Sequence, residues 1–232
     1  MTKTIFITVG TTLFEALIEC VTDSLFLNLI AQHGYDRLII QYGKGTMPIL
    51  PRTGKMDSIT INRDSMKGKG GDDNEDKRGI YKITNEANQN DKDDSFQHVI
   101  KEIEWEIYRF KASLEEDMNN ADLIISHAGA GSIMEGLEHC RRRNSQNQQK
   151  QFHDIKKLVV VINDILMDNH QCELAYALEK RKFLFVLSKP EMLLQVEKMQ
   201  NIENYIPACF EGGDDSSFGV LLDDWMGYSK AE

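Results

Sequence analysis

Long apolar runs are absent from this sequence. None of its 232 residues belongs to a stretch near the ~18 to 20 apolar residues that a membrane-spanning helix requires. The N-terminus, MTKTIFITVG, enters a strand-like run directly, without the basic region and cleavage site of a secretory signal. We therefore expect a soluble, cytoplasmic protein.

Basic side chains are fewer than acidic ones. The chain has 27 basic against 37 acidic side chains, and its formal net charge is −10. A field of this sign repels the phosphate backbone of nucleic acids and anionic membrane surfaces. Nucleic acid is therefore not an expected partner.

Cysteine is scarce and scattered. Cys20, Cys140, Cys172 and Cys209 form no CxxC pair and lie far apart in the sequence. This spacing favours reduced thiols over disulfides or zinc ligands, so no metal site is expected.

What the sequence does contain is an alternation of strand-like and helix-like segments. β-Branched and apolar runs predict strands at Thr4–Val9, Arg37–Gly43, Glu106–Phe110, Ala121–Ser126, Lys157–Asn163 and Phe183–Ser188. Periodicity and capping residues predict helices at Phe14–Gln32, from Ser113, from Ser132 to about Cys140, from Asn169 to about Arg181, and after Pro190. Strands separated by helices form a parallel sheet that helices cover on both faces. The expected fold is a Rossmann-like α/β domain.

Two polar segments, at about 52–98 and 141–154, interrupt what we interpret as one domain over residues 1–232. The first includes MKGKGGDDNEDKRG and has few apolar anchors, so it buries too little surface to offset the entropy of ordering. We interpret it as a mobile insertion with a short strand at GIYKIT. Near the C-terminus, Ser216–Tyr228 predicts one more apolar helix.

Unusual residues follow three of the expected strands. They are Gly10-Thr11-Thr12, the segment from His127 to Ser132, and the segment from Asn163 to Gln171. In open α/β sheets, ligands bind beyond the carboxyl ends of the strands, where the strand order reverses. These segments are therefore the candidate site.

The stretch SHAGAGSIMEGLEHC, which begins at Ser126, has the character of a diphosphate site. Gly129 and Gly131 keep side chains away from a ligand, while the start of the next helix offers unpaired N–H groups and a positive dipole end. Ser132 adds a hydroxyl, and Glu135 is an acceptor for the hydroxyls of a ribose. The alternative is that the glycines only allow close packing of the helix on the sheet.

The glycines do not form a nicotinamide fingerprint. The GxGxxG pattern fails because Met134 stands at the third glycine, and no Walker lysine follows. This disfavours a nucleotide-dependent oxidoreductase. A non-catalytic nucleotide-sugar-binding module would share the same pocket and stays an alternative.

Three motifs occur in a specific order: VGTT, then ADLIISHAGAGSIME, then VVVINDILMDNHQCELA. Together they resemble the small catalytic subunits of the eukaryotic UDP-N-acetylglucosamine transferase of N-glycan precursor assembly. Those subunits are similar to the C-terminal, donor-binding half of the bacterial N-acetylglucosaminyltransferase that makes the peptidoglycan lipid precursor.

The resemblance implies a UDP-GlcNAc-dependent glycosyltransferase of the GT-B type whose two halves are separate polypeptides. This chain would be the donor-binding half, and a membrane-anchored subunit would supply the acceptor-side domain. The heterodimer would transfer GlcNAc, with inversion, from UDP-GlcNAc to dolichyl-diphosphate-GlcNAc at the cytosolic face of the endoplasmic reticulum. The length agrees, because a complete GT-B enzyme needs two domains of ~150 residues or more.

The resemblance also implies which residues bind the donor. They are Gly10, Thr11, Thr12, Gly129, Ala130, Gly131, Ser132, Glu135, Asn169, His170 and Gln171. Glu135 matches the glutamate that binds the ribose, and the last three match a polar cluster at the GlcNAc and the distal phosphate. From the residues alone, Thr11 and Thr12 equally suit caps of the first helix. His170 and Gln171 equally suit surface positions at a helix start.

His127 is the candidate catalytic residue, although a histidine at a strand end is more often a hydrogen-bonded structural group. The reaction needs a base for the acceptor O4 proton and stabilisation of the departing UDP. The helix N-termini and hydroxyls suit the second task, and we expect the base on the partner or at the interface. No DxD motif occurs in a suitable loop, so neither a metal nor another cofactor is expected. The C-terminal helix is expected to bind the partner or to pack on its own domain.

Overall fold

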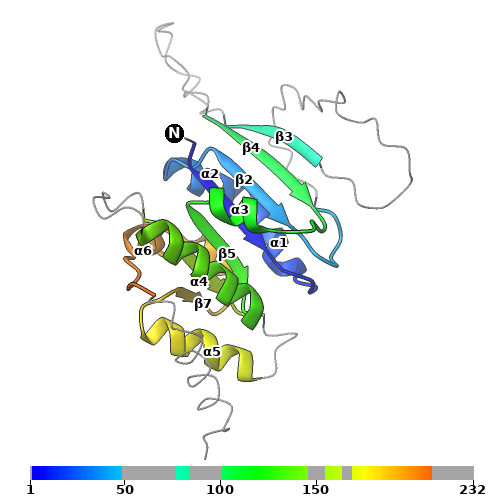
Figure 1. Ribbon diagram of the computed structural model, residues 1–232. Coiled ribbons are helices and arrows are strands. Elements are labelled where there is room, and N and C mark those ends of the chain that lie inside the picture. The colour runs from blue at the N-terminus through cyan, green and yellow to red at the C-terminus, as the bar shows by residue number, and fades with distance from the viewer. Residues whose placement is uncertain (1, 49–76, 84–100, 146–154, 164–168, 211–232) are drawn as a thin grey trace, which may run out of the picture.

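The computed structural model describes residues 2–48, 77–83, 101–145, 155–163 and 169–210 (Figure 1). Most of the insertion expected at 52–98, residues 146–154 of the second insertion, and the helix expected at Ser216–Tyr228 lie outside these ranges. Within them, no helix is long and apolar enough to cross a membrane.

A seven-stranded sheet runs through the described residues in the order β3-β4-β2-β1-β5-β6-β7. The strands are β1 (Thr4–Thr8), β2 (Arg37–Gln41), β3 (Lys77–Ile83), β4 (Lys101–Tyr108), β5 (Leu123–His127), β6 (Lys157–Val161) and β7 (Phe185–Leu187). Every neighbouring pair is parallel except β3 and β4. The predicted parallel sheet is confirmed, and β3 contains most of the short strand expected at GIYKIT.

The strand expected at Glu106–Phe110 begins earlier, at Lys101. It pairs with β3 on one side over its first seven residues and with β2 on the other, so main-chain hydrogen bonding extends it beyond its most apolar part. The polar residues that hid this extension from the sequence pattern, Glu102 and Glu104, are exposed.

Helices cover both faces of the sheet. They are α1 (Glu15–Thr22), α2 (Ser24–Gln32), α3 (Glu115–Asn120), α4 (Ala130–Ser145), α5 (Asn169–Lys180), the 3-10 helix η3 (Pro190–Leu194) and α6 (Val196–Asn204). Ile5 and Ile7 of β1 pack into a core with α1, α2 and α6, while Phe6 points the other way into a core with α3, α4 and α5. The alternation of side chains along a strand explains why β1 is buried throughout.

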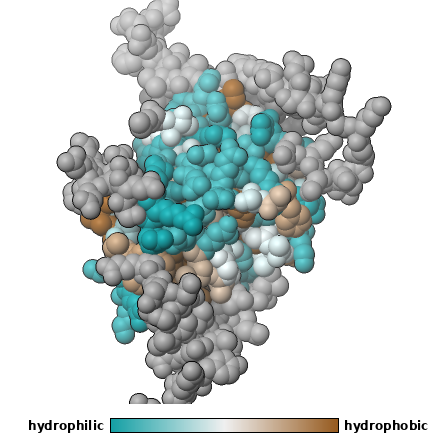
Figure 2. Space-filling view, in the orientation of Figure 1, coloured by the Kyte–Doolittle hydropathy of each residue, from teal (hydrophilic) through white to brown (hydrophobic). Residues whose placement is uncertain are grey.

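Figure 1 shows α3 and α4 in front of the sheet, and α5 contributes to the same core as these two helices. The outer surface on that side is largely hydrophilic in Figure 2, as expected for helices that bury one side only.

The helix predicted over Phe14–Gln32 is divided in two. Asp23 has an extended backbone, and its side chain accepts a hydrogen bond from the Leu25 N–H at 2.7 Å, which caps α2. The apolar periodicity continues across this break, so the sequence pattern missed it.

The predicted bounds of α4 are wrong at both ends. The helix begins at Ala130 instead of Ser132, and it continues past Cys140 into the polar segment. Arg141 and Arg142 both pair with Glu138 at helical spacing, which supports this extension without apolar contacts.

Candidate functional site

The chain reverses its direction of travel across the sheet between β1 and β5. From β1 it proceeds to β2 and on to β4, and it then returns to the other side of β1 for β5, β6 and β7. The carboxyl ends of β1 and β5 are therefore neighbours at the topological switch point. The residues predicted to bind a ligand follow these two strand ends.

The loops after β1 and β5 lie in direct contact. A Cβ atom added to Gly10 would lie 2.7 Å from Cε1 of His127 and 3.4 Å from Oγ of Ser132. Gly10 also has a φ of +59°, a region that residues with side chains rarely adopt. Glycine is thus required here both by the backbone angle and by the close approach of β5.

The loop after β1 uses most of its own hydrogen-bond donors. The Gly10 N–H donates to Oγ1 of Thr8 at 3.1 Å, and both the N–H and the hydroxyl of Thr12 donate to the Val9 carbonyl, at 3.2 and 2.7 Å. The Gly10 amide and the Thr12 hydroxyl, both in residues expected to bind the donor, are therefore already bonded within the loop. Thr11 is exposed at the tip of the loop and is the member left to face a ligand.

Neither threonine caps the first helix. α1 starts at Glu15, and its N-cap residue, Phe14, makes no side-chain capping bond. The capping interpretation of Thr11 and Thr12 is therefore wrong.

The N-terminus of α4 is open. The first hydrogen bond of the helix runs from the Ile133 N–H to the Gly129 carbonyl at 2.9 Å, so the N–H groups of the three preceding residues have no acceptor within the helix. Ala130 and Gly131 are exposed, and a Cβ atom on Gly131 would meet no heavy atom within 4 Å. The packing interpretation thus fails for Gly131, where free space surrounds the backbone.

Gly129 has a different reason for being glycine. A Cβ atom there would overlap Nε2 of His127. The imidazole ring of His127 therefore lies against both Gly10 and Gly129.

His127 is buried, with 7% of its surface exposed. Its Nδ1 has no hydrogen-bond partner of normal geometry. Burial lowers the pKa of the ring below its ordinary value, and the nearby Thr8 main chain opposes this shift only in part. The ring is therefore neutral at pH 7, which suits a group placed against backbone amides.

Glu135 lies on α4, about one turn after Gly131, and its side chain is exposed. Its position beside the open helix end matches the predicted contact with a ribose. That contact stays a prediction.

The third segment also reaches the same edge of the sheet. Nδ2 of Asn163, just after β6, donates to the Leu13 carbonyl at 3.2 Å and so ties this strand end to the loop after β1. α5 begins at Asn169 as predicted. The side chains of Asn169, His170 and Gln171 lie outside the described residues, and their assigned roles stay predictions.

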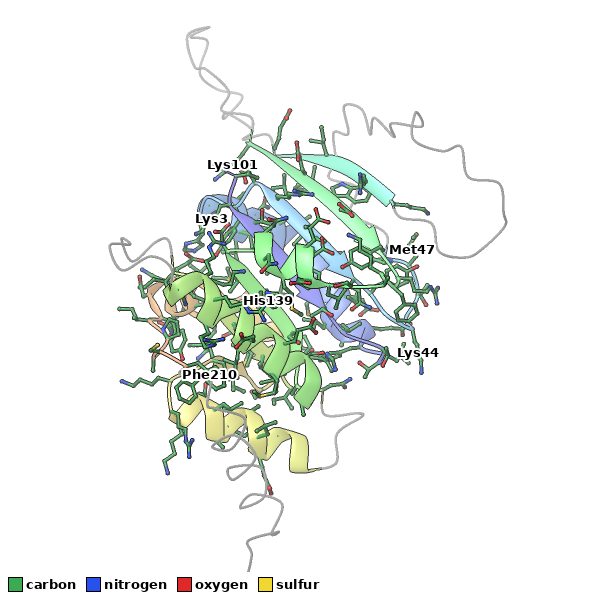
Figure 3. All side chains as sticks on the ribbon, viewed as in Figure 1. Lys3, Lys44, Met47, Lys101, His139 and Phe210 are labelled. Carbon is green, nitrogen blue, oxygen red and sulfur yellow. The ribbon has the colours of Figure 1, made fainter. Side chains whose placement is uncertain are left out.

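The sequence interpretation missed Gln41 and the glycine loop that follows β2. Gly43 has a φ of +63°, and a Cβ atom there would lie 2.6 Å from the Thr12 carbonyl oxygen. The Lys44 N–H donates to the same oxygen at 3.2 Å. Figure 3 shows Lys3, just before β1, and Lys44, just after β2, at opposite ends of the strands. The loop after β2 therefore lies at the carboxyl ends of the strands, as the loops after β1 and β5 do. The available signal was a glutamine in the otherwise apolar run LIIQY.

Residues 69–140 match the model of the glycosyltransferase family 28 C-terminal domain. The matched segment includes β5 and most of α4, and therefore the open helix end.

The chain is similar to proteins named UDP-N-acetylglucosamine transferase subunit ALG13. It is 36% identical to the Homo sapiens protein over 228 residues, which is 94% of this chain and 14% of that protein. It is 30% identical to the protein of Cryptococcus neoformans strain JEC21 over 227 residues, which is 97% of each. The chain thus spans about 14% of the length of the human and mouse relatives and almost all of the fungal one.

A solved structure shares the fold. The NMR solution structure of ALG13 aligns with 95% of each chain at a TM-score of 0.52, with 22% sequence identity.

Proposed function

Because this chain belongs to the family of UDP-N-acetylglucosamine transferase subunits, we propose that it is the donor-binding half of a glycosyltransferase that uses UDP-GlcNAc. The observation that carries this proposal is the meeting of the Gly10 and Gly131 loops at the switch point of the sheet. Parallel α/β sheets bind nucleotides at such a point.

The donor would lie with its diphosphate on the open end of α4. Unpaired N–H groups at Ala130, Gly131 and Ser132 and the helix dipole attract an anion there. Thr11 approaches from the β1 side, and Glu135 accepts hydrogen bonds from the ribose hydroxyls. The GlcNAc would extend toward the start of α5, where Asn169 to Gln171 are expected to contact it.

The reaction proposed is transfer of GlcNAc to dolichyl-diphosphate-GlcNAc with inversion. As the bond from the sugar to the diphosphate breaks, negative charge grows on UDP, and the fixed N–H groups of α4 stabilise that charge. Because these groups are already oriented, no metal is required in this account.

The proton of the acceptor hydroxyl needs a base from elsewhere. His127 is neutral and hence able to accept a proton, but it lies under the glycine loops with little exposed surface. Its position favours a role in spacing the loops. We therefore propose that the base belongs to the partner or to the interface.

The names of the relatives call them subunits of a transferase. We propose that the partner of this chain is a membrane-anchored subunit that carries the acceptor-side domain. Such a partner would recruit the chain to the cytosolic face of the endoplasmic reticulum, and the chain alone would be inactive.

The test is a transfer assay with this chain, a candidate membrane subunit and dolichyl-diphosphate-GlcNAc in vesicles. We expect labelled GlcNAc to move from UDP-GlcNAc to the lipid only when both polypeptides are present. UDP-GlcNAc binding without transfer, across all candidate partners, would favour a non-catalytic binding module. Competition for the site by a nicotinamide dinucleotide would favour an oxidoreductase.

A further inference from the structure

Gln41 is a buried polar side chain at the carboxyl end of β2, with 2% of its surface exposed. Its Oε1 accepts a hydrogen bond from Oγ1 of Thr8 at 2.7 Å. Its Nε2 donates to the carbonyl oxygens of Gly10 and Arg109, at 2.7 and 2.8 Å. One amide thus connects the chain segments that leave β1, β2 and β4.

The orientation of this amide is determined by its partners. Nε2 faces two carbonyl oxygens, and a reversed amide would place an oxygen against both of them. Consequently Oε1 must accept, and the Thr8 hydroxyl must donate to it. The same hydroxyl oxygen accepts from the Gly10 N–H at 3.1 Å.

These bonds form a closed ring around Gly10. Its N–H is bonded through Thr8 to Gln41, and its carbonyl is bonded to Gln41 directly. On the opposite side, His127 lies so close that a Cβ atom added to Gly10 would be 2.7 Å from its Cε1. The loop is therefore held from two directions in a conformation with positive φ.

Holding Gly10 in this way determines what the loop presents to a ligand. The donors of Gly10 and Thr12 are used inside the loop, and Thr11 is left exposed beside the open end of α4. A loop already fixed in its bound form loses less entropy when the ligand arrives.

We propose that Gln41, acting through Thr8, is a positioning residue that holds the Gly10–Thr12 loop in the conformation that receives the donor diphosphate. This inference rests on the proposed function, and it adds to that proposal a residue that does not touch the substrate.

The experiment compares buried-threonine and glutamine variants in the complete assembly. Thr8→Val removes the hydroxyl at constant shape, Gln41→Met removes the amide, and Thr8→Ser restores the hydroxyl. Thr22→Val is the matched control, since the Thr22 hydroxyl is also buried and donates to a carbonyl, that of Ile18 at 2.8 Å, but within α1.

We expect Thr8→Val and Gln41→Met each to raise the KM for UDP-GlcNAc and the Kd for UDP by roughly tenfold. Their kcat should fall much less. Thr8→Ser and Thr22→Val should keep the wild-type KM and Kd. If Thr8→Val and Gln41→Met kept the wild-type KM and Kd and lost only thermal stability or active fraction, Gln41 would be merely structural and the proposal would be wrong.

Amide hydrogen exchange separates this proposal from the proposed function. We expect the Gly10 N–H to be protected in the wild-type chain and to exchange faster in Thr8→Val. An unprotected Gly10 N–H in the wild type would overturn the bonded ring whether or not the chain binds UDP. A protected Gly10 together with no UDP binding by the wild-type assembly would instead show that the proposed function is at fault.

Discussion

Gly10 and His127 touch across the boundary between β1 and β5, where an added methyl group on Gly10 would lie 2.7 Å from Cε1 of the imidazole. This contact places two loops, separated by more than a hundred residues in sequence, on one ligand-sized edge of the sheet. A side chain at position 10 would therefore collide with the imidazole.

Replacing Gly10 with Ala tests this contact. The substitution adds both a strained φ of +59° and a clash with His127, so we expect unfolding free energy to fall by roughly 2 to 3 kcal/mol and UDP-GlcNAc use to be lost. Gly34→Ala is the control, because Gly34 has a φ of +87° but free space around it. Gly34→Ala should lower the free energy of unfolding by about 1 kcal/mol and leave the KM for UDP-GlcNAc unchanged. Equal losses for the two variants, measured by urea unfolding, would refute the role of the His127 contact.

Glu135→Ala tests the ribose contact. If the carboxylate binds both ribose hydroxyls, its loss should lower kcat/KM for UDP-GlcNAc by an amount equivalent to about 2 to 3 kcal/mol of activation free energy. Unfolding free energy should hardly change, because the side chain is exposed. Glu116→Ala, which removes an exposed glutamate on α3, serves as the control. Unchanged kinetics in Glu135→Ala would remove the ribose assignment.

Glu106 makes the folding stability of the chain depend on pH. It is buried among Lys111, Arg78 and Arg37, with its nearest ion pair to Nζ of Lys111 at 3.0 Å. Burial by itself would raise the pKa of Glu106, but the bonds from Lys111 and Arg78 outweigh it and lower the pKa. The contribution of Glu106 to the free energy of unfolding is therefore fully present above its unfolded pKa of ~4.3. It is lost as the pH falls through its folded pKa.

Lys111→Met should accordingly lower the unfolding free energy by about 3 kcal/mol at pH 7, because Glu106 and Asp117 both lose a partner. The difference from the wild type should shrink as the pH falls through the folded pKa of Glu106, where that carboxylate becomes protonated. Lys44→Met removes an exposed lysine and should have little effect. A difference that stays constant from pH 7 to pH 3 would contradict the assignment to these ion pairs.

Chelation tests the metal-independent mechanism. We expect GlcNAc transfer by the assembled enzyme to be unchanged in EDTA, because the N–H groups at the start of α4 take the charge that a metal would otherwise neutralise. Activity lost in EDTA and restored by Mg²⁺ or Mn²⁺ would contradict this prediction.

Local sequence signals were enough to predict most of the strands and helices, and the structure brings the glycine segments after β1 and β5 to the same end of the sheet. Apolar runs such as Lys157–Val161 and the glycines after β5 are visible in short stretches of sequence. The break at Asp23 was not visible, because the apolar pattern continues through it. The length of α4 was not visible either, since ion pairs of Glu138 extend it.

The internal bonding of the β1 loop could not be predicted, because it depends on tertiary contacts. Gln41 lies 31 residues from Gly10 in sequence, and only the parallel pairing of β1 with β2 brings its amide to the loop. For the same reason the sequence alone did not show that the Gly10 amide is bonded within its own loop.

The most direct test of the diphosphate site is the affinity of the assembled enzyme for UDP when Gly131 is replaced by Ala. The new methyl group meets no heavy atom within 4 Å outside its own helix turn and chain neighbours, so unfolding free energy should be unchanged or slightly raised. We nevertheless expect UDP affinity to fall at least about tenfold, since the ligand must approach this backbone closely. Wild-type affinity for UDP in Gly131→Ala would contradict a diphosphate site at the start of α4.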